Sequence, residues 1–189
     1  MNYRKYQQSR NLSWQILLCE KVRTLPVDVV ALCRSMGIRI VKTSLLHPDA
    51  GDGFSCYISG RPCICLQRET KPARQRFTVA HELGHILLGH VGQKGLVNRE
   101  PSPGDNAIEQ AANVFASRLL APACVLWGCG VSSAAEIAVL CDISPTAAKY
   151  RWNRMKLLLQ RSKFLTNRLE RKVYRRFAKY IKAYRSGSP

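Results

Sequence analysis

Acidic residues are scarce in this chain. Its 189 residues hold 12 Asp and Glu against 30 Lys and Arg, which gives a formal net charge of +18 at pH 7. Long apolar runs are also missing, and none approaches the roughly 20 residues that a helix needs to span a bilayer. The first residues, in which Arg4 and Lys5 precede a polar stretch, lack the apolar core of a secretory signal. These absences argue against a membrane or secreted protein, and we expect a cytoplasmic protein with no transmembrane segment.

Paired cysteine motifs are absent as well. The eight cysteines are scattered through mostly apolar settings without a C-x-x-C pair, so in a reducing compartment we expect them to act as small hydrophobic residues. Only Cys63 and Cys65 would share one face of a strand, which leaves an accessory metal site conceivable.

The chain also shows no internal repeat or low-complexity linker. With 189 residues, 46% of them hydrophobic, it can form one compact domain with an appendage.

The most informative motif is His81-Glu82-Leu83-Gly84-His85, an H-E-x-x-H pattern. On a helix, residues four apart lie on one face, so both imidazoles can reach one Zn²⁺ at roughly 2.0–2.1 Å while Glu82 addresses a water. This spacing is typical of zinc peptidases. A five-residue match also arises by chance, so the surrounding sequence must decide between a metal site and a helix that carries two histidines.

The residues around the motif predict a helix. Pro72 offers a start, and apolar residues recur at three- and four-residue steps from Arg76 to Val91. Gly84 costs about 1 kcal/mol relative to Ala inside a helix, so we expect a close approach there, either at the metal or in a helix–helix contact. Because Val91 stands where a longer zincin pattern has a third histidine, we interpret His90 as structural or as a support for a metal ligand.

A second helix is predicted from Asn106, with Pro122 after its end. Glu109 and Asn113 share one face of this helix, and the carboxylate would complete a His₂Glu metal site that the amide supports by a hydrogen bond. In the alternative interpretation Asn106 and Glu109 form a capping box. One carboxylate cannot fill both roles, and we favour Glu109 as the third ligand because few other acids are available nearby.

Together these residues resemble the ImmA/IrrE family of metallopeptidases. The resemblance is carried by Phe77 to His85 with the trailing Gly89-His90, by Glu109 to Ala116 and by Leu119 to Pro122, and it covers roughly residues 20–160. In the family an acidic residue of the second motif is the third zinc ligand. This chain keeps Glu109 and has Ala111 at another commonly acidic position, which strengthens the choice of Glu109.

The resemblance implies a zinc-dependent endopeptidase in which His81, His85 and Glu109 bind Zn²⁺. Glu82 would be the general base, taking a proton from the attacking water and delivering one to the leaving amine. Tyr57 or an arginine near residues 92–105 could stabilise the oxyanion. The implied substrate is a helix-turn-helix transcriptional repressor of a mobile element or stress response. The alternative is a non-catalytic, metal-stabilised regulator that binds DNA or a repressor.

The N-terminal half predicts a small sheet. We expect a helix at residues 29–36, a strand at 38–41, and strands at 54–58 and 63–67 joined by the turn at 59–62. An edge strand beside a zinc cleft can pair with an extended peptide. Gly51 and Gly53 either allow a close backbone approach or belong to a plain loop, and residues 92–105 form a loop that could border the cleft.

Two predicted helices follow the peptidase motifs. Ser133 with Glu136 forms a capping box for a helix that ends near Cys141, and Ser144 with Pro145 starts another. This outline fits a helix-turn-helix DNA reader, and it fits any αα-hairpin equally well.

Basic residues concentrate at the C-terminus. Residues 151–189 hold thirteen Lys and Arg and one acidic residue, Glu170, a surplus of twelve positive charges. Apolar residues from Leu165 to Tyr184 follow a helical stripe, which predicts a basic amphipathic helix. Such a helix can pack on its own domain, join a protein partner, touch anionic lipid or contact nucleic acid.

These observations predict an α+β protein with a zincin-like core, in which a small β-sheet lies beside the H-E-x-x-H helix, and a mostly helical C-terminal part. We expect a metallopeptidase domain at residues 1–125, a helical hairpin packed on it at 126–160, and the basic helix with a loose end at 161–189.

Overall fold

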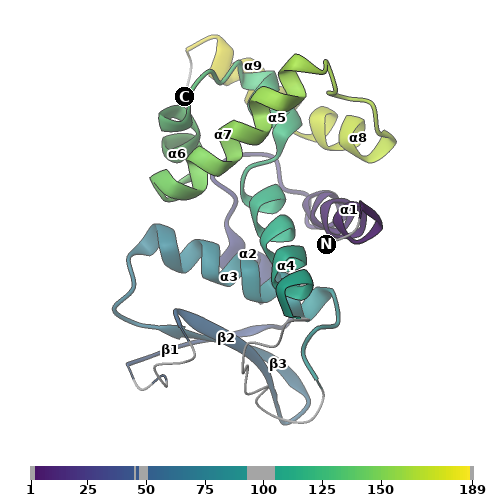
Figure 1. Cartoon of the computed structure of the whole chain (residues 1–189). Coiled ribbons are helices and arrows are strands. Elements are labelled where there is room, and N and C mark those ends of the chain that lie inside the picture. The colour runs from purple at the N-terminus through teal and green to yellow at the C-terminus, as the bar shows by residue number, and fades with distance from the viewer. Residues whose placement is uncertain (1–2, 45, 47–50, 93–104, 188–189) are drawn as a thin grey trace. The chain divides into compact units, whose positions relative to one another are not determined.

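The computed structural model describes residues 3–44, 46, 51–92 and 105–187, which form nine helices and three strands (Figure 1). In chain order these are α1 (Tyr3–Cys19), α2 (Val29–Ser35), β1 (Arg39–Thr43), β2 (Gly53–Ile58), β3 (Arg61–Gln67), α3 (Pro72–Leu87), α4 (Asp105–Leu120), α5 (Ala123–Cys129), α6 (Ala134–Cys141), α7 (Pro145–Gln160), α8 (Arg168–Arg176) and α9 (Ala178–Arg185). The mixed content confirms the α+β prediction.

By its internal packing the chain divides into two compact units. The first comprises residues 1–10 and 28–116, and the second comprises residues 11–27 and 117–189. Helices α1 and α4 each contribute to both units. The three-part domain division at residues 125 and 160 stays a prediction, because these units reflect packing within the fold and not independent folding.

The sheet of the first unit has the strand order β1-β3-β2. Strand β1 runs parallel to β3 with Arg39 opposite Cys63, and β2 runs antiparallel to β3 with Gly53 opposite Leu66. All three strands lie within two residues of their predicted positions. Since β3 is central, β2 is an edge strand of the sheet that the described residues form.

Helix α3 packs on β2 and β3 (Figure 1). It starts at Pro72 as predicted, and its buried face includes Ala80 and Leu83. It ends at Leu87, four residues before the end of the predicted pattern, because Leu88 caps it and Gly89 follows with a φ of 72°. This backbone conformation favours glycine and turns the chain out of the helix.

Helix α4 crosses α3 closely at Gly84. A Cβ atom added to Gly84 would lie 2.9 Å from Cδ1 of Phe115, whose side chain is fully buried. Of the two explanations for this glycine, the helix–helix contact is therefore the one that the structure supports.

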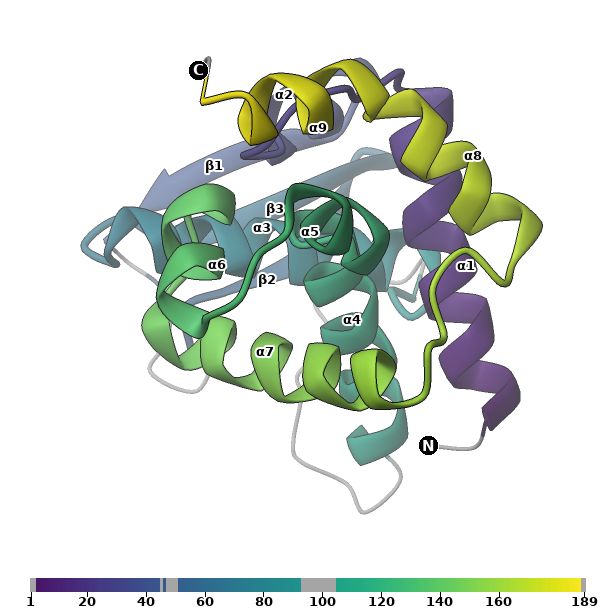
Figure 2. The ribbon, with the colours of Figure 1, turned by 90° about the horizontal axis from the view of Figure 1, so that it is seen from above.

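Helices α6 and α7 of the second unit form a hairpin (Figure 2). Ser133 accepts a hydrogen bond from the Glu136 amide at 3.1 Å, and Ser144 caps α7 ahead of Pro145, so both predicted starts are confirmed. The Glu136 carboxylate accepts from the Ser132 amide and not from that of Ser133, which shifts the second half of the capping box by one residue.

The basic C-terminal segment forms two consecutive helices, α8 and α9, where the apolar stripe suggested one. Asn167 caps α8, and Phe177 lies between the two helices. Val173, Phe177 and Ile181 are buried, so the apolar stripe packs inside the second unit, where α5 contacts both helices.

Two features differ from expectation. Helix α1 was not anticipated, although it buries Trp14 and Leu17. Among the described residues, Ala107–Cys129 is also long and apolar enough to cross a membrane, by length and composition only, contrary to the expectation that no such run exists. The most apolar 18-residue window is 78% buried inside the protein, which is the burial of a core helix.

Candidate metal centre

Three donor atoms from α3 and α4 converge in the first unit. Nε2 of His81 and Nε2 of His85 lie 3.0 Å apart, because the two residues are one helical turn from each other. Glu109 places Oε2 3.1 Å from His81 Nε2 and Oε1 3.4 Å from His85 Nε2. The structure thus brings together the three residues predicted to bind the metal. The alternative capping box falls partly outside the described residues, because the side chain of Asn106 is not among them.

The hydrogen-bond partners of the two histidine Nδ1 atoms suit a cation bound between the Nε2 atoms and the Glu109 carboxylate. Nδ1 of His81 lies 3.0 Å from Oδ1 of Asn113, an oxygen that can only accept a hydrogen bond, so a neutral His81 ring that donates from Nδ1 presents a lone pair at Nε2. Nδ1 of His85 lies 3.2 Å from Nδ1 of His90, and the tautomer in which His85 donates this hydrogen bond likewise has a lone pair at Nε2. Two lone pairs and a carboxylate then face one another, an arrangement that a positive ion stabilises.

The spacing and the chemistry of the donors both fit zinc. Tetrahedral bonds of roughly 2.0–2.1 Å place neighbouring donor atoms about 3.3 Å apart. The two Nε2 atoms are 3.0 Å apart, and the Glu109 carboxylate approaches them at 3.1 Å through Oε2 and at 3.4 Å through Oε1. Two imidazoles and one carboxylate form a donor set that catalytic zinc sites use. Among the described residues, the group that could hold an ion here consists of His81, His85 and Glu109.

Glu82 lies beside the donor atoms and not among them. Its side chain is only 2% exposed, and its Oε2 accepts a hydrogen bond from the Ser55 hydroxyl at 2.7 Å. Its other oxygen, Oε1, lies 4.0 Å from His81 Nε2. Ser55 was missed in the sequence analysis. The alternation of β2 could have found it, because Gly53, Ser55 and Tyr57 share the face of the strand that meets α3.

A cleft of about 230 Å³ borders the site. The described residues that line it are Asp52, Gly53, Phe77, Thr78, His81, Glu82 and Asn113. A Cβ atom added to Gly53 would lie 2.5 Å from the carbonyl oxygen of Cys65, so this glycine permits the close approach considered above. Tyr57 is not among the described lining residues, and residues 93–104 of the loop expected at the cleft lie outside the described part of the chain.

The donor side chains differ in their access to solvent. The His85 side chain is fully buried, that of His81 is 13% exposed and that of Glu109 is 35% exposed. His81 and Glu82 both line the cleft, so a peptide that enters it would meet the carboxylate and the open side of the donor cluster together.

A second group of potential ligands lies on the same sheet. Cys56 stands opposite Cys63, Cys65 is two residues further along β3, and their sulfur atoms all lie within 4.8 Å of one another. Burial raises the pKa of Cys65 to about 12 and also raises that of Cys56. All eight cysteines are free thiols. The neutral thiol is the form that packs as a small hydrophobic residue, and only the thiolate binds a metal.

Comparison with known proteins agrees with this geometry. Residues 33–153 match the peptidase M78 family, described as the IrrE N-terminal-like domain. A protein of Deinococcus deserti named radiation response metalloprotease IrrE is 36% identical over 98 residues, which cover 46% of this chain and 34% of the relative. Its namesake in Deinococcus radiodurans is 32% identical over 98 residues, which cover 46% of this chain and 29% of the relative.

The chain therefore spans about a third of the length of these relatives. The family match is more extensive: it covers more than half of the chain and includes both the H-E-x-x-H helix and the Glu109 helix. This chain belongs to the ImmA/IrrE family of metallopeptidases.

Proposed function

We propose that this protein is a zinc-dependent endopeptidase with a zincin-like core. The observation that carries the proposal is the convergence of His81, His85 and Glu109 on one point, with the buried Glu82 carboxylate beside them and a cleft leading to both. A zinc ion bound there would supply Lewis-acid polarisation of a water and of a peptide carbonyl.

Side chains of the protein transfer the protons and orient the metal ligands. Ser55 holds one oxygen of Glu82, which leaves Oε1 directed to the donor cluster as the proton acceptor. Glu82 takes a proton from the water as that water attacks the carbonyl carbon, and then delivers a proton to the amine nitrogen as the peptide bond breaks. Asn113 and His90 orient the two histidine rings through their Nδ1 atoms.

The edge strand β2 supports a peptide as the substrate. Gly53 begins this strand at the cleft, and Ser55 of the same strand contacts Glu82. An extended peptide can pair with the free edge of a sheet through its backbone, which would deliver its carbonyl groups along the cleft.

The wider context rests on the family. By resemblance, the substrate is a helix-turn-helix transcriptional repressor of a mobile element or stress response, and the names of both relatives refer to a radiation response. The free thiols support a reducing, cytoplasmic location.

Metal content tests the ligand assignment. The purified protein should contain one zinc per chain by elemental analysis, and replacing His81, His85 or Glu109 by Ala should strip it, because each variant loses one of three protein ligands. Full zinc retention in Glu109→Ala would refute the assignment of this carboxylate.

Proteolysis tests the mechanism. Incubation with the repressor encoded nearest to the gene, followed by mass spectrometry, should reveal a zinc-dependent cut. Glu82→Gln should keep zinc and lower the cleavage rate by about 10²–10⁴-fold, the usual contribution of a general base. Glu69→Gln, at an exposed carboxylate that follows β3 and is not among the described residues lining the cleft, is the matched control and should cleave normally. If the wild-type and Glu82→Gln proteins bind zinc and the repressor equally but neither cuts it, the non-catalytic regulator is the correct alternative.

A further inference from the structure

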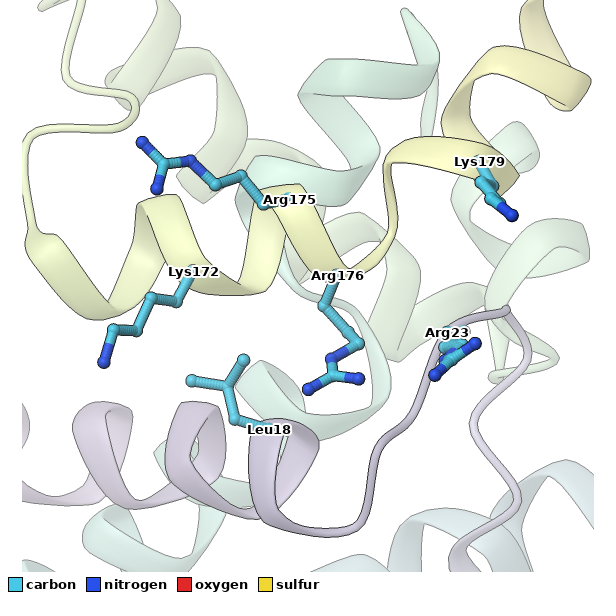
Figure 3. Close-up of a pocket in the computed structure, with 6 residues that line it drawn as sticks. All are labelled: Leu18, Arg23, Lys172, Arg175, Arg176 and Lys179. Atoms are coloured by element: carbon cyan, nitrogen blue, oxygen red, sulfur yellow. The ribbon is translucent and has the colours of Figure 1, made fainter.

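Five basic side chains line one pocket of the second unit. The pocket has a volume of about 590 Å³ and is lined by Leu18 of α1, Arg23 after α1, Lys172, Arg175 and Arg176 of α8, and Lys179 of α9. Figure 3 shows Lys172 and Arg176 extending from α8 on the side where Leu18 of α1 lies. The pocket is thus built by segments that are about 150 residues apart in the sequence.

The sequence explains why these side chains gather. Lys172, Arg175, Arg176 and Lys179 recur at three- and four-residue steps, which is the period of one helical face. The intervening apolar residues Val173 and Phe177 are fully buried. Packing of this apolar face inside the second unit therefore turns the basic face outward.

The described residues that line the pocket include no acidic residue. Within the described part of the chain, none of the five basic side chains makes a hydrogen bond or an ion pair. Arg176 is half-buried and the other four are exposed. Like charges brought together without a counter-charge repel one another, so an anionic ligand would gain from each of them.

The lining also indicates what kind of anion fits. Five cations favour a ligand that carries several negative charges. Among the described residues, the lining offers no aromatic side chain on which a base could stack and no amide side chain that could read a base edge. Recognition would therefore be of phosphate groups and independent of the base sequence.

We infer that this pocket binds the phosphodiester backbone of a nucleic acid without sequence preference. The inference is independent of the proposed peptidase activity, because none of the pocket residues lies in the unit that carries the metal ligands. Its consequence would be that the enzyme is concentrated on nucleic acid, where a DNA-bound protein substrate is found.

Substitution of charges tests this better than truncation. Deleting α8 and α9 would remove the buried side chains of Val173, Phe177 and Ile181 and unfold part of the protein. Replacing Lys172, Arg175, Arg176 and Lys179 by Gln keeps the apolar face. Binding to a fluorescein-labelled DNA duplex of arbitrary sequence is measured by anisotropy between about 50 and 200 mM salt, a range over which phosphate contacts weaken strongly.

The quadruple variant should bind at least about tenfold more weakly, and the slope of log K against log salt should fall by up to about four, since each phosphate contact contributes roughly 0.9. Its matched control replaces four exposed cations of the same unit outside the pocket, Lys149, Lys156, Arg161 and Lys163, by Gln. This control should bind nearly as tightly as the wild type, and circular dichroism should show that both variants are folded.

A single substitution at Arg23 separates the effect of the pocket from that of net charge, because Arg23 is distant from α8 in the sequence and lines the same pocket only through the tertiary structure. Arg23→Gln should lower the salt slope by about one, whereas Lys21→Gln, two residues away, exposed and outside the pocket, should not. Equal losses in the two single variants, or in the two quadruple variants, would show that net charge alone drives binding and would overturn the inference. The inference would also be overturned if a poly-glutamate peptide of equal charge bound more tightly than the DNA duplex, or if inorganic tripolyphosphate bound as tightly as the duplex.

Discussion

Individual hydrogen bonds set the geometry of the metal centre. The contact from Nδ1 of His81 to Oδ1 of Asn113 is 3.0 Å long, reaches across from α3 to α4, and holds the side of the ring that faces away from the other donor atoms. Partners of this kind orient a ligand ring and fix which nitrogen carries the proton.

Asn113→Ala should therefore weaken zinc binding by about 10–100-fold while the fold is retained. Competition with a zinc-binding dye measures the affinity. Asn113→Asp keeps an acceptor oxygen at the same position and should recover most of the loss. If Asn113→Ala bound zinc as tightly as the wild type, the orientation of His81 would have to come from another contact.

At the scale of elements, the distance between α3 and α4 determines whether the third ligand reaches the two histidines. A close contact between these helices joins Gly84 and Phe115, one residue before His85 and two residues after Asn113. The metal centre therefore depends on a contact that contains no metal ligand.

Gly84→Ala should disturb this packing. The new Cβ would lie 2.9 Å from Phe115 Cδ1, so the helices must separate or the ring must move. Overpacking costs about 1–3 kcal/mol, and the better helix propensity of Ala returns about 1 kcal/mol. We expect a lower free energy of unfolding in urea together with weaker zinc binding.

Phe115→Leu supplies the control for this prediction. In a variant that carries Phe115→Leu the ring is absent, so adding Gly84→Ala should cost nothing or stabilise α3. A Gly84→Ala penalty that is the same with and without Phe115→Leu would show that the contact is not its cause.

At the scale of the whole molecule, buried thiol and hydroxyl groups with raised pKa values make the free energy of unfolding depend on pH. Burial raises the pKa of the Cys33 and Cys124 thiols from 9.0 to about 12, and that of the Tyr180 hydroxyl from 10.0 to about 12. As pH rises from 9.0 toward 12, the unfolded chain releases these protons while the folded chain retains them, so unfolding becomes easier.

The urea midpoint, measured in the presence of a reductant, should therefore be steady below pH 9 and fall as pH rises above it. Cys33→Ala should be less stable at every pH, because it leaves a cavity, but its midpoint should fall less steeply with pH. A midpoint that is constant or rises in this alkaline range would contradict the prediction.

The sequence by itself determined the features that depend on local spacing. The imidazoles of His81 and His85 meet because residues four apart always share a helical face, and the starts of α3, α6 and α7 follow from proline and from side-chain caps beside them. The strands of the hairpin were found from their alternation and their turn.

Only the tertiary structure decided which distant residues come together. Glu109 could have been a helix cap or a ligand, and the packing of α4 against α3 placed it at the histidines. The contact of Ser55 with Glu82 and the place of Arg23 in the basic pocket had no local signal. The physical reason is that periodicity fixes the face on which a side chain lies, whereas its partner on another element depends on how buried apolar surfaces such as those of Phe115 and Phe177 pack.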